Sequence, residues 1–172
     1  DYILDAEELA AELAEQNILL APRDGSANPD DVGEFKTEID LTIPQIQFCE
    51  LECKHPLFVA GFGSGKSKTL AVSAVMDVVN YPGANVAVYA PTFDLLHLII
   101  VPYISEILDD GGYEFKYNGG HHFFDIKGLG KIICRSMDNP SRIVGYETFR
   151  AHCDEIDTLK FDKADNAWNK VI

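Results

Sequence analysis

The chain has 172 residues, 47% of them hydrophobic and 24% charged, which suits one globular domain with its own core and leaves little room for a second. It contains no run of about 18 apolar residues, which argues against a membrane-spanning helix, and its acidic N-terminus is unlike a signal peptide. With a net charge of −14, the chain as a whole repels nucleic acid at long range. Any DNA contact must therefore be local or come from another part of the protein.

Residues 1–38 predict an acidic helix and a linker that precede the core. Asp5 and Glu8 form a capping pair, and apolar residues recur at helical spacing as far as Leu20. Residues 22–38 contain prolines, glycines and acids without periodicity, which indicates an exposed linker. We therefore expect the compact domain to occupy residues 39–172.

Strand and helix patterns alternate along residues 39–172. The alternation predicts an α/β fold in which helices cover both faces of a mostly parallel sheet. The chain stops soon after its last strand, so we expect the sheet to be incomplete at the C-terminus. A kink is expected near Pro102. The predicted helices cover 68–79 and 93–108, and the predicted strands cover 57–60, 86–90, 123–126, 131–134 and 148–153.

A glycine loop lies between the first predicted strand and the first helix. Residues 61–67 read GFGSGKS and match the end of the phosphate-loop pattern GxxxxGK[ST], whose first glycine is Ala60 here. Glycines let successive backbone N–H groups turn toward a phosphate, and the helix that follows directs its N-terminus at the anion. Lys66 would bridge the β- and γ-phosphates, and the Ser67 hydroxyl would ligate Mg²⁺. The alternative is a glycine-rich turn that binds nothing.

The predicted nucleotide contacts include this loop, the residue after it and one glutamine upstream. They are Gln45, Gly61, Phe62, Gly63, Ser64, Gly65, Lys66, Ser67 and Lys68.

Two acids follow the last predicted strand. Asp154 at the strand end would hold Mg²⁺ through water, and Glu155 could polarise the attacking water as a general base. Arg150 and His152 make the strand before them less apolar than a buried strand usually is. The alternative is an acidic helix cap over residues 154–157.

A glutamine and an arginine complete the candidate site. The amide of Gln45 or Gln47 can pair with N6 and N7 of adenine, or it can simply face solvent on a short helix. Arg142 could act as an arginine finger on its own nucleotide or on a neighbour's. The alternative for Arg142 is an ordinary surface arginine.

The order of these motifs resembles the large terminase subunit of tailed bacteriophages. The resemblance covers about residues 40–160 and implies an ASCE, or RecA-like, P-loop ATPase domain that powers the packaging of viral DNA into a procapsid. It implies that Gln45 reads adenine, that Lys66 and Ser67 hold phosphate and Mg²⁺, and that Asp154 and Glu155 activate water. The motifs that carry it are Pro44-Gln45, the loop at 61–67, Tyr89-Ala90-Pro91-Thr92, Asn139-Pro140-Ser141-Arg142-Ile143 and Asp154-Glu155-Ile156-Asp157.

The resemblance also implies partners and a location. The partners are double-stranded DNA, a portal and a small terminase subunit. The assembled motor would be a homo-oligomeric ring, with a monomer possible in isolation and no membrane involved. The location is the host cytoplasm at the procapsid, which agrees with four scattered cysteines that form no disulfide framework.

The chain departs from the family pattern in two respects. Many members place an arginine inside the loop, where this chain has Phe62, so a second positive charge would come from elsewhere, with Arg142 as the candidate. The family's coupling motif and nuclease domain would lie beyond Ile172, so no nuclease activity is expected. The alternatives are another P-loop ATPase, such as a helicase-like one, or a regulatory module that binds nucleotide without turnover. Glu155 argues against the regulatory module.

Overall fold

A five-stranded sheet with strand order β2-β3-β4-β1-β5 organises the computed structural model, which describes residues 39–51, 53–138 and 147–171. The predicted N-terminal helix and linker lie outside these residues, and so does Arg142. Among the described helices, none is both long and apolar enough to cross a membrane. The helical elements are α2 (Ile43–Cys49), α3 (Lys66–Asn80), α4 (Phe93–Leu95), the π-helical turn η1 (Leu96–Ile100), α5 (Val101–Asp110), the 3₁₀ turn η3 (Ile156–Thr158) and α6 (Phe161–Val171). The strands are β1 (Asn85–Ala90), β2 (Phe115–Asn118), β3 (Phe123–Ile126), β4 (Gly130–Ser136) and β5 (Arg150–Cys153).

The sheet has a parallel half and an antiparallel half. Strand β1 pairs in parallel with β4 and β5, and Val88 lies opposite Cys134 on one side and His152 on the other. Strands β2, β3 and β4 pair antiparallel, so the predicted hairpin is β3 and β4. The α/β fold class is confirmed. The parallel half carries the candidate site, because parallel strands bring their carboxyl ends to one edge.

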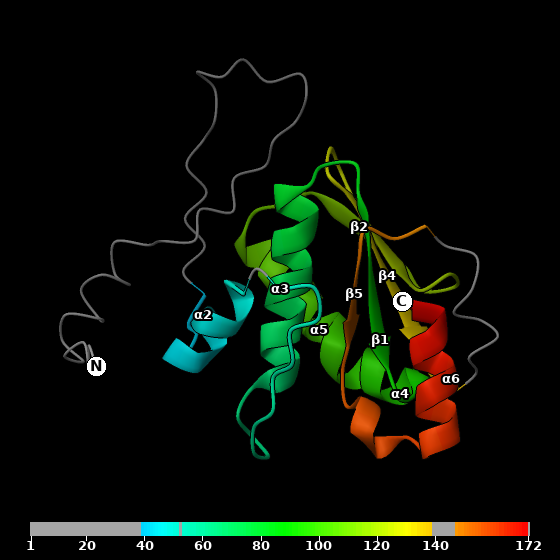
Figure 1. Cartoon of the computed structure of the whole chain (residues 1–172). Coiled ribbons are helices and arrows are strands. Elements are labelled where there is room, and N and C mark those ends of the chain that lie inside the picture. The colour runs from blue at the N-terminus through cyan, green and yellow to red at the C-terminus, as the bar shows by residue number, and fades with distance from the viewer. Residues whose placement is uncertain (1–38, 52, 139–146, 172) are drawn as a thin grey trace, which may run out of the picture.

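Helices cover both faces of the sheet (Figure 1). Alternate residues of β1 point to opposite faces, so Val86 and Val88 pack against α3 and α5, whereas Ala87 and Tyr89 pack with Ala167 of α6. The sheet is therefore buried between two helical layers, which explains why its central strands are continuously apolar.

The predicted helix over 93–108 is observed in three pieces. Residues 93–95 and 101–110 are α-helical, and the π-helical turn η1 lies between them. Pro102 has no N–H, so the α-helical bond to the carbonyl of Leu98 cannot form. The interruption falls immediately before this proline, where such a bond would be lost.

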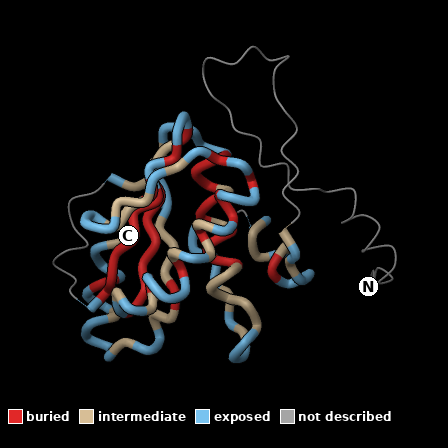
Figure 2. Tube along the Cα trace, turned by 180° about the vertical axis from the view of Figure 1, so that it is seen from behind, coloured by how far each residue is buried: buried red, intermediate tan, exposed pale blue. Residues whose placement is uncertain are grey.

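The predicted strand over 57–60 is wrong. Residues 57–60, which we call the lead-in, form neither helix nor strand, and Leu57 and Val59 are 78% and 82% exposed. The buried residues gather instead in the central strands and the helices packed on them (Figure 2). A strand needs a neighbour for its N–H and C=O groups. In the described part of the chain, β5 pairs only with β1, so no strand lies beside the lead-in. The apolar pattern is present in the sequence, but the described residues offer it no partner.

Candidate nucleotide site

The glycine loop takes a backbone conformation that glycine favours. Helix α3 begins at Lys66, directly after Gly65, and both Gly63 and Gly65 lie in the left-handed region, with φ of 75° and 78°. A Cβ at Gly65 would also collide with Nε2 of Gln45. The second and third glycines of the loop are therefore required both by backbone angle and, at Gly65, by close packing.

Lys66 ties the two ends of the loop together. Its ammonium donates to the carbonyls of Ala60 and Gly61, at 2.9 Å each. The Gly61 carbonyl also accepts from the Ser64 hydroxyl at 2.8 Å. An ammonium has three donors, so these two bonds leave one N–H of Lys66 for a phosphate oxygen.

Gln45 braces the loop from α2. Its Oε1 accepts from the N–H of Thr42 at 2.7 Å, and its Nε2 donates to the Ser64 carbonyl at 3.0 Å. The side chain is buried, whereas Gln47 is exposed. Of the two glutamines that the sequence left open, the structure brings Gln45 to the loop. Adenine reading by Gln45 stays a prediction.

Ser67 and Asp154 meet at the carboxyl edge of the sheet. The Ser67 hydroxyl donates to Oδ2 of Asp154 at 2.7 Å. Asp154 is buried, and its N–H donates to the Tyr89 carbonyl at 2.8 Å, so it continues the β5–β1 ladder by one residue. The first turn of α3 and the end of β5 thus hold two oxygen side chains in contact across the sheet edge.

This pair fits the ligand chemistry of Mg²⁺. Hydroxyl and carboxylate oxygens are hard ligands, and Mg²⁺ in nucleotide sites is held by one or two protein groups together with water and substrate phosphates. Ser67 and Asp154 supply two such groups beside the phosphate loop. They are the residues that would hold the ion.

Glu155 has an uncommon backbone conformation. Its φ and ψ are 46° and 38°, in the left-handed region, which costs a non-glycine residue about 1–3 kcal/mol. Its carbonyl accepts from the N–H and the hydroxyl of Thr158, at 3.1 and 2.8 Å. Its side chain makes no capping bond to η3, so the acidic-cap alternative has no support at this residue. Such conformations cluster at functional sites.

The other predicted contacts are placed differently. Phe62 is fully exposed at the tip of the loop. The Lys68 ammonium donates to the Asp40 carbonyl at 2.9 Å, so this side chain is directed to the start of the described chain and not to the loop. Thr92, which belongs to a motif of the resemblance and was not a predicted contact, accepts from the N–H of Leu95 at 3.3 Å and caps α4. Arg142 lies outside the described residues.

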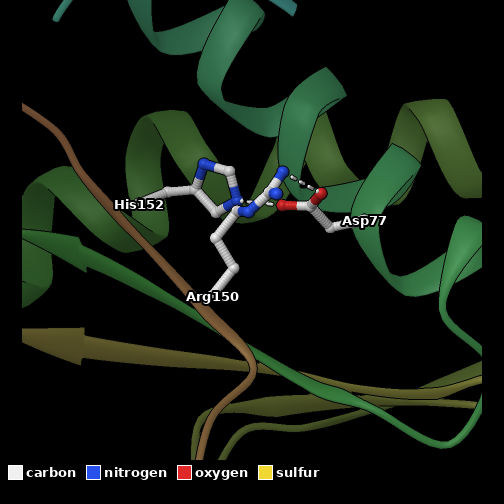
Figure 3. Close-up of polar contacts among 3 residues, drawn as sticks. All are labelled: Asp77, Arg150 and His152. Atoms are coloured by element: carbon white, nitrogen blue, oxygen red, sulfur yellow. Dashed lines mark hydrogen bonds and ion pairs between the residues drawn. The ribbon is translucent and has the colours of Figure 1, made fainter. Parts of the chain in front are cut away.

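Sequence reasoning missed Asp77 of α3. Its buried carboxylate binds both Arg150 and His152 of β5 (Figure 3), the two residues that interrupt the apolar strand pattern. The available signal was a single carboxylate in the buried stretch of α3, together with two basic residues at alternate positions of one strand. Spacing alone could not show that these three side chains meet.

Comparisons with known proteins point to one family. The family model for the terminase large subunit, T4-like-virus type, N-terminal, matches residues 57–172. The large terminase ATPase domain of Thermus phage P74-26 superposes with a TM-score of 0.63 and 17% identity, over 78% of this chain and 61% of that one. The large terminase of a thermophilic bacteriophage gives a TM-score of 0.62 and 15% identity, over 77% of this chain and 36% of that one. The same protein in complex with ADP gives 0.60 and 17%, over 76% and 36%.

These matches have a limited extent. A search of curated proteins found no match, and this chain spans about a third to three fifths of the terminase chains it superposes on. At these identities the structural similarity establishes the fold. The family model covers most of the chain and includes the glycine loop, Ser67 and Asp154. The chain therefore belongs to the terminase large-subunit family, in its N-terminal region.

Proposed function

We propose that this domain binds and hydrolyses ATP with Mg²⁺ and serves as the ATPase part of a viral DNA-packaging motor. The observation that carries the proposal is the 2.7 Å contact between Ser67 and Asp154. It joins a glycine loop and helix N-terminus to an acid at the end of a parallel strand, which is the arrangement that an ATP phosphate and its metal need. Family membership and the ADP complex of a structural relative agree with it.

The loop would bind the phosphates. Backbone N–H groups from Gly61 to Gly65 would surround the β-phosphate, and Lys66 would bridge the β- and γ-phosphates with the donor that its loop bonds leave over. Gln45 would contact adenine while it supports the loop at Ser64. These interactions hold the nucleotide in place and neutralise part of its charge.

The sheet edge would supply the chemistry. Mg²⁺, when bound, would supply positive charge that offsets the charge developing on the phosphates. The Ser67 hydroxyl and the Asp154 carboxylate, which lie in contact at this edge, would hold the ion. The Glu155 carboxylate would accept the proton of the attacking water.

The proposal extends to the assembled motor. Double-stranded DNA, a portal and a small terminase subunit are the proposed partners, in a ring at the procapsid in the host cytoplasm. The net charge of −14 implies that DNA contacts are local or lie elsewhere in the whole protein. Arg142 is the proposed finger, acting on a neighbouring subunit's nucleotide, so the isolated domain should hydrolyse ATP slowly.

The test separates binding from chemistry. Glu155→Gln should retain the affinity for ATP·Mg²⁺ and slow phosphate release by on the order of 10²-fold, because it removes the general base. Single-turnover assays with protein in excess over ATP, together with calorimetric titration, measure both quantities. The matched control is Glu106→Gln at an exposed position of α5, which should change neither.

Two outcomes would reject parts of this proposal. A parent domain that fails to bind ATP rejects the nucleotide site itself. A parent domain that binds ATP but releases no phosphate, alone or in the assembled motor with DNA, supports the regulatory alternative instead.

A further inference from the structure

The carboxylate of Asp77 is buried and shared between two residues of β5. Nη1 of Arg150 lies 2.6 Å from Oδ1, and Nε2 of His152 lies 2.8 Å from Oδ2. The side chains of Asp77 and His152 are almost fully buried, whereas that of Arg150 is half exposed. Figure 3 shows both basic side chains reaching from β5 to the same carboxylate on α3. We call these three residues the Asp77 clamp.

The clamp lies on the same face of β5 as Asp154. Alternate residues of a strand share a face, so Arg150, His152 and Asp154 all point toward α3. Ala151 and Cys153 pack on the opposite side, against the cluster that contains α6. The polar face of β5 is thus used entirely for contacts with α3: Asp77 at one end and Ser67 at the other.

The two contacts fix β5 against α3 at two points. From Ser67 to Asp77 the helix rises about 15 Å, and from Arg150 to Asp154 an extended strand covers about 13 Å. The helix and strand run in opposite directions and their lengths match. Each polar contact can therefore form only when the other is in register.

Apolar packing alone would hold this register weakly. Strand β5 has four residues and pairs with a single strand, β1, in the described chain, and hydrophobic attraction is not directional. A shift of one residue would turn Arg150 and His152 away from α3. It would also leave the Asp77 carboxylate buried without its partners, which is strongly unfavourable. The clamp therefore penalises the shift that would also remove Asp154 from Ser67.

We propose that Asp77 is a positioning residue: through Arg150 and His152 it sets the register of β5 on α3 and so keeps Asp154 against Ser67. This inference rests on the proposed function, because the Ser67–Asp154 pair is the proposed Mg²⁺ site. Asp77 itself would touch neither nucleotide nor metal. Loss of the clamp should reduce the extent to which Mg²⁺ strengthens nucleotide binding. It should leave the affinity of the loop for nucleotide in the absence of metal unchanged.

The experiment measures how much Mg²⁺ strengthens nucleotide binding. The Kd of a fluorescent ATP analogue is determined for the whole chain in Mg²⁺ and in EDTA, and the ratio of the two is the Mg²⁺ enhancement. Asp77→Asn should reduce this enhancement about tenfold, as loss of an outer partner commonly reduces metal affinity, with the Kd in EDTA unchanged. Asp110→Asn, at the exposed C-terminal residue of α5, is the charge-matched control and should keep the parent values.

A second variant covers a failure of Asp77→Asn to fold. Asp77→Leu combined with His152→Leu replaces the buried polar pair by apolar side chains, which commonly preserves stability, and the half-exposed Arg150 can turn to water. This variant should melt near the parent temperature and lose about tenfold in Mg²⁺ enhancement, because leucines pack without fixing the register.

The outcomes distinguish the inference from the proposed function. A folded leucine variant with full Mg²⁺ enhancement overturns the positioning role of Asp77 and leaves the proposed function standing. A parent chain whose nucleotide affinity does not respond to Mg²⁺ overturns the proposed metal site and the positioning role with it.

Discussion

The lead-in with its glycine loop and the contact between α3 and β5 belong to one candidate site, yet they are held in different ways. The loop side is exposed at Leu57, Val59 and Phe62. Lys66 supports it by binding the carbonyls of the loop itself, and Gln45 supports it from α2. The α3–β5 side lies on buried elements and is fixed by side chains distant in sequence, at Ser67–Asp154 and at the Asp77 clamp.

The described residues therefore fix the metal side of the site more firmly than the loop side. The oxygen pair at the sheet edge is positioned by packed secondary structure. The loop takes its shape from glycine backbone angles and from a lysine bonded to its own carbonyls. We therefore expect the Ser67–Asp154 pair to keep its position without nucleotide, and the glycine loop to change its conformation when nucleotide binds.

The largest expected contrast is in thiol reactivity. Cys134 is buried in β4, and burial raises the pKa of its thiol to about 12. At pH 8 roughly one molecule in 10⁴ would carry the thiolate, and the rate should rise tenfold per pH unit below that pKa. Cys53, just before the lead-in, is exposed. Timed alkylation with mass spectrometry should show Cys134 reacting on the order of 10³-fold more slowly than Cys53.

The sign of this effect also concerns stability. The pKa of Cys134 is higher in the folded chain than the ordinary thiol value. The buried neutral thiol therefore adds to the free energy of unfolding at neutral pH, and this stabilisation is lost as the pH rises toward 12. In denaturant the two thiols should react at similar rates, which serves as the control. Fast labelling of Cys134 in the folded chain would show that the sheet opens as readily as the lead-in.

The second prediction concerns the loop lysine. Lys66→Ala should weaken ATP·Mg²⁺ binding by roughly 1.5–3 kcal/mol, about 10- to 150-fold, because it removes a charge-assisted contact to phosphate. Calorimetric titration measures the change. The control is Lys116→Ala, which removes an equal charge from an exposed position of β2, the edge strand opposite β5. It should leave the affinity unchanged. Equal affinity in the Lys66 variant and the parent would contradict the phosphate-loop assignment.

The smallest contrast concerns two valines. Val88 of β1 is fully buried and Val59 of the lead-in is exposed. Val88→Ala should lower the free energy of unfolding by roughly 1–3 kcal/mol, whereas Val59→Ala should change it by less than about 0.5 kcal/mol. Urea denaturation followed by circular dichroism measures both. A large cost at Val59 would mean that the lead-in is packed after all, as the apolar pattern of 57–60 suggested.

Local patterns in the sequence predicted much of the fold. Small and apolar residues at helical spacing predicted α3 to within two residues at its start, and the turn residues at 128–130 predicted the β3–β4 hairpin. Strand β2 was missed, because its four residues are only partly apolar and become a strand through pairing with β3. The predicted strand at the lead-in was wrong for the opposite reason, because an apolar run forms no strand without a neighbouring strand to pair with.

The same distinction between local patterns and long-range contacts applies to the candidate site. Local sequence was enough to predict the glycine loop, the lysine and serine after it and the acids after β5, because these depend on backbone angles and chemistry within a few residues. The folded chain was needed to show that Ser67 meets Asp154, that Gln45 and not Gln47 reaches the loop, and that Asp77 binds Arg150 and His152. These contacts join residues far apart in the chain, and they exist because β5 pairs with β1 under α3, a pairing that no local pattern encodes.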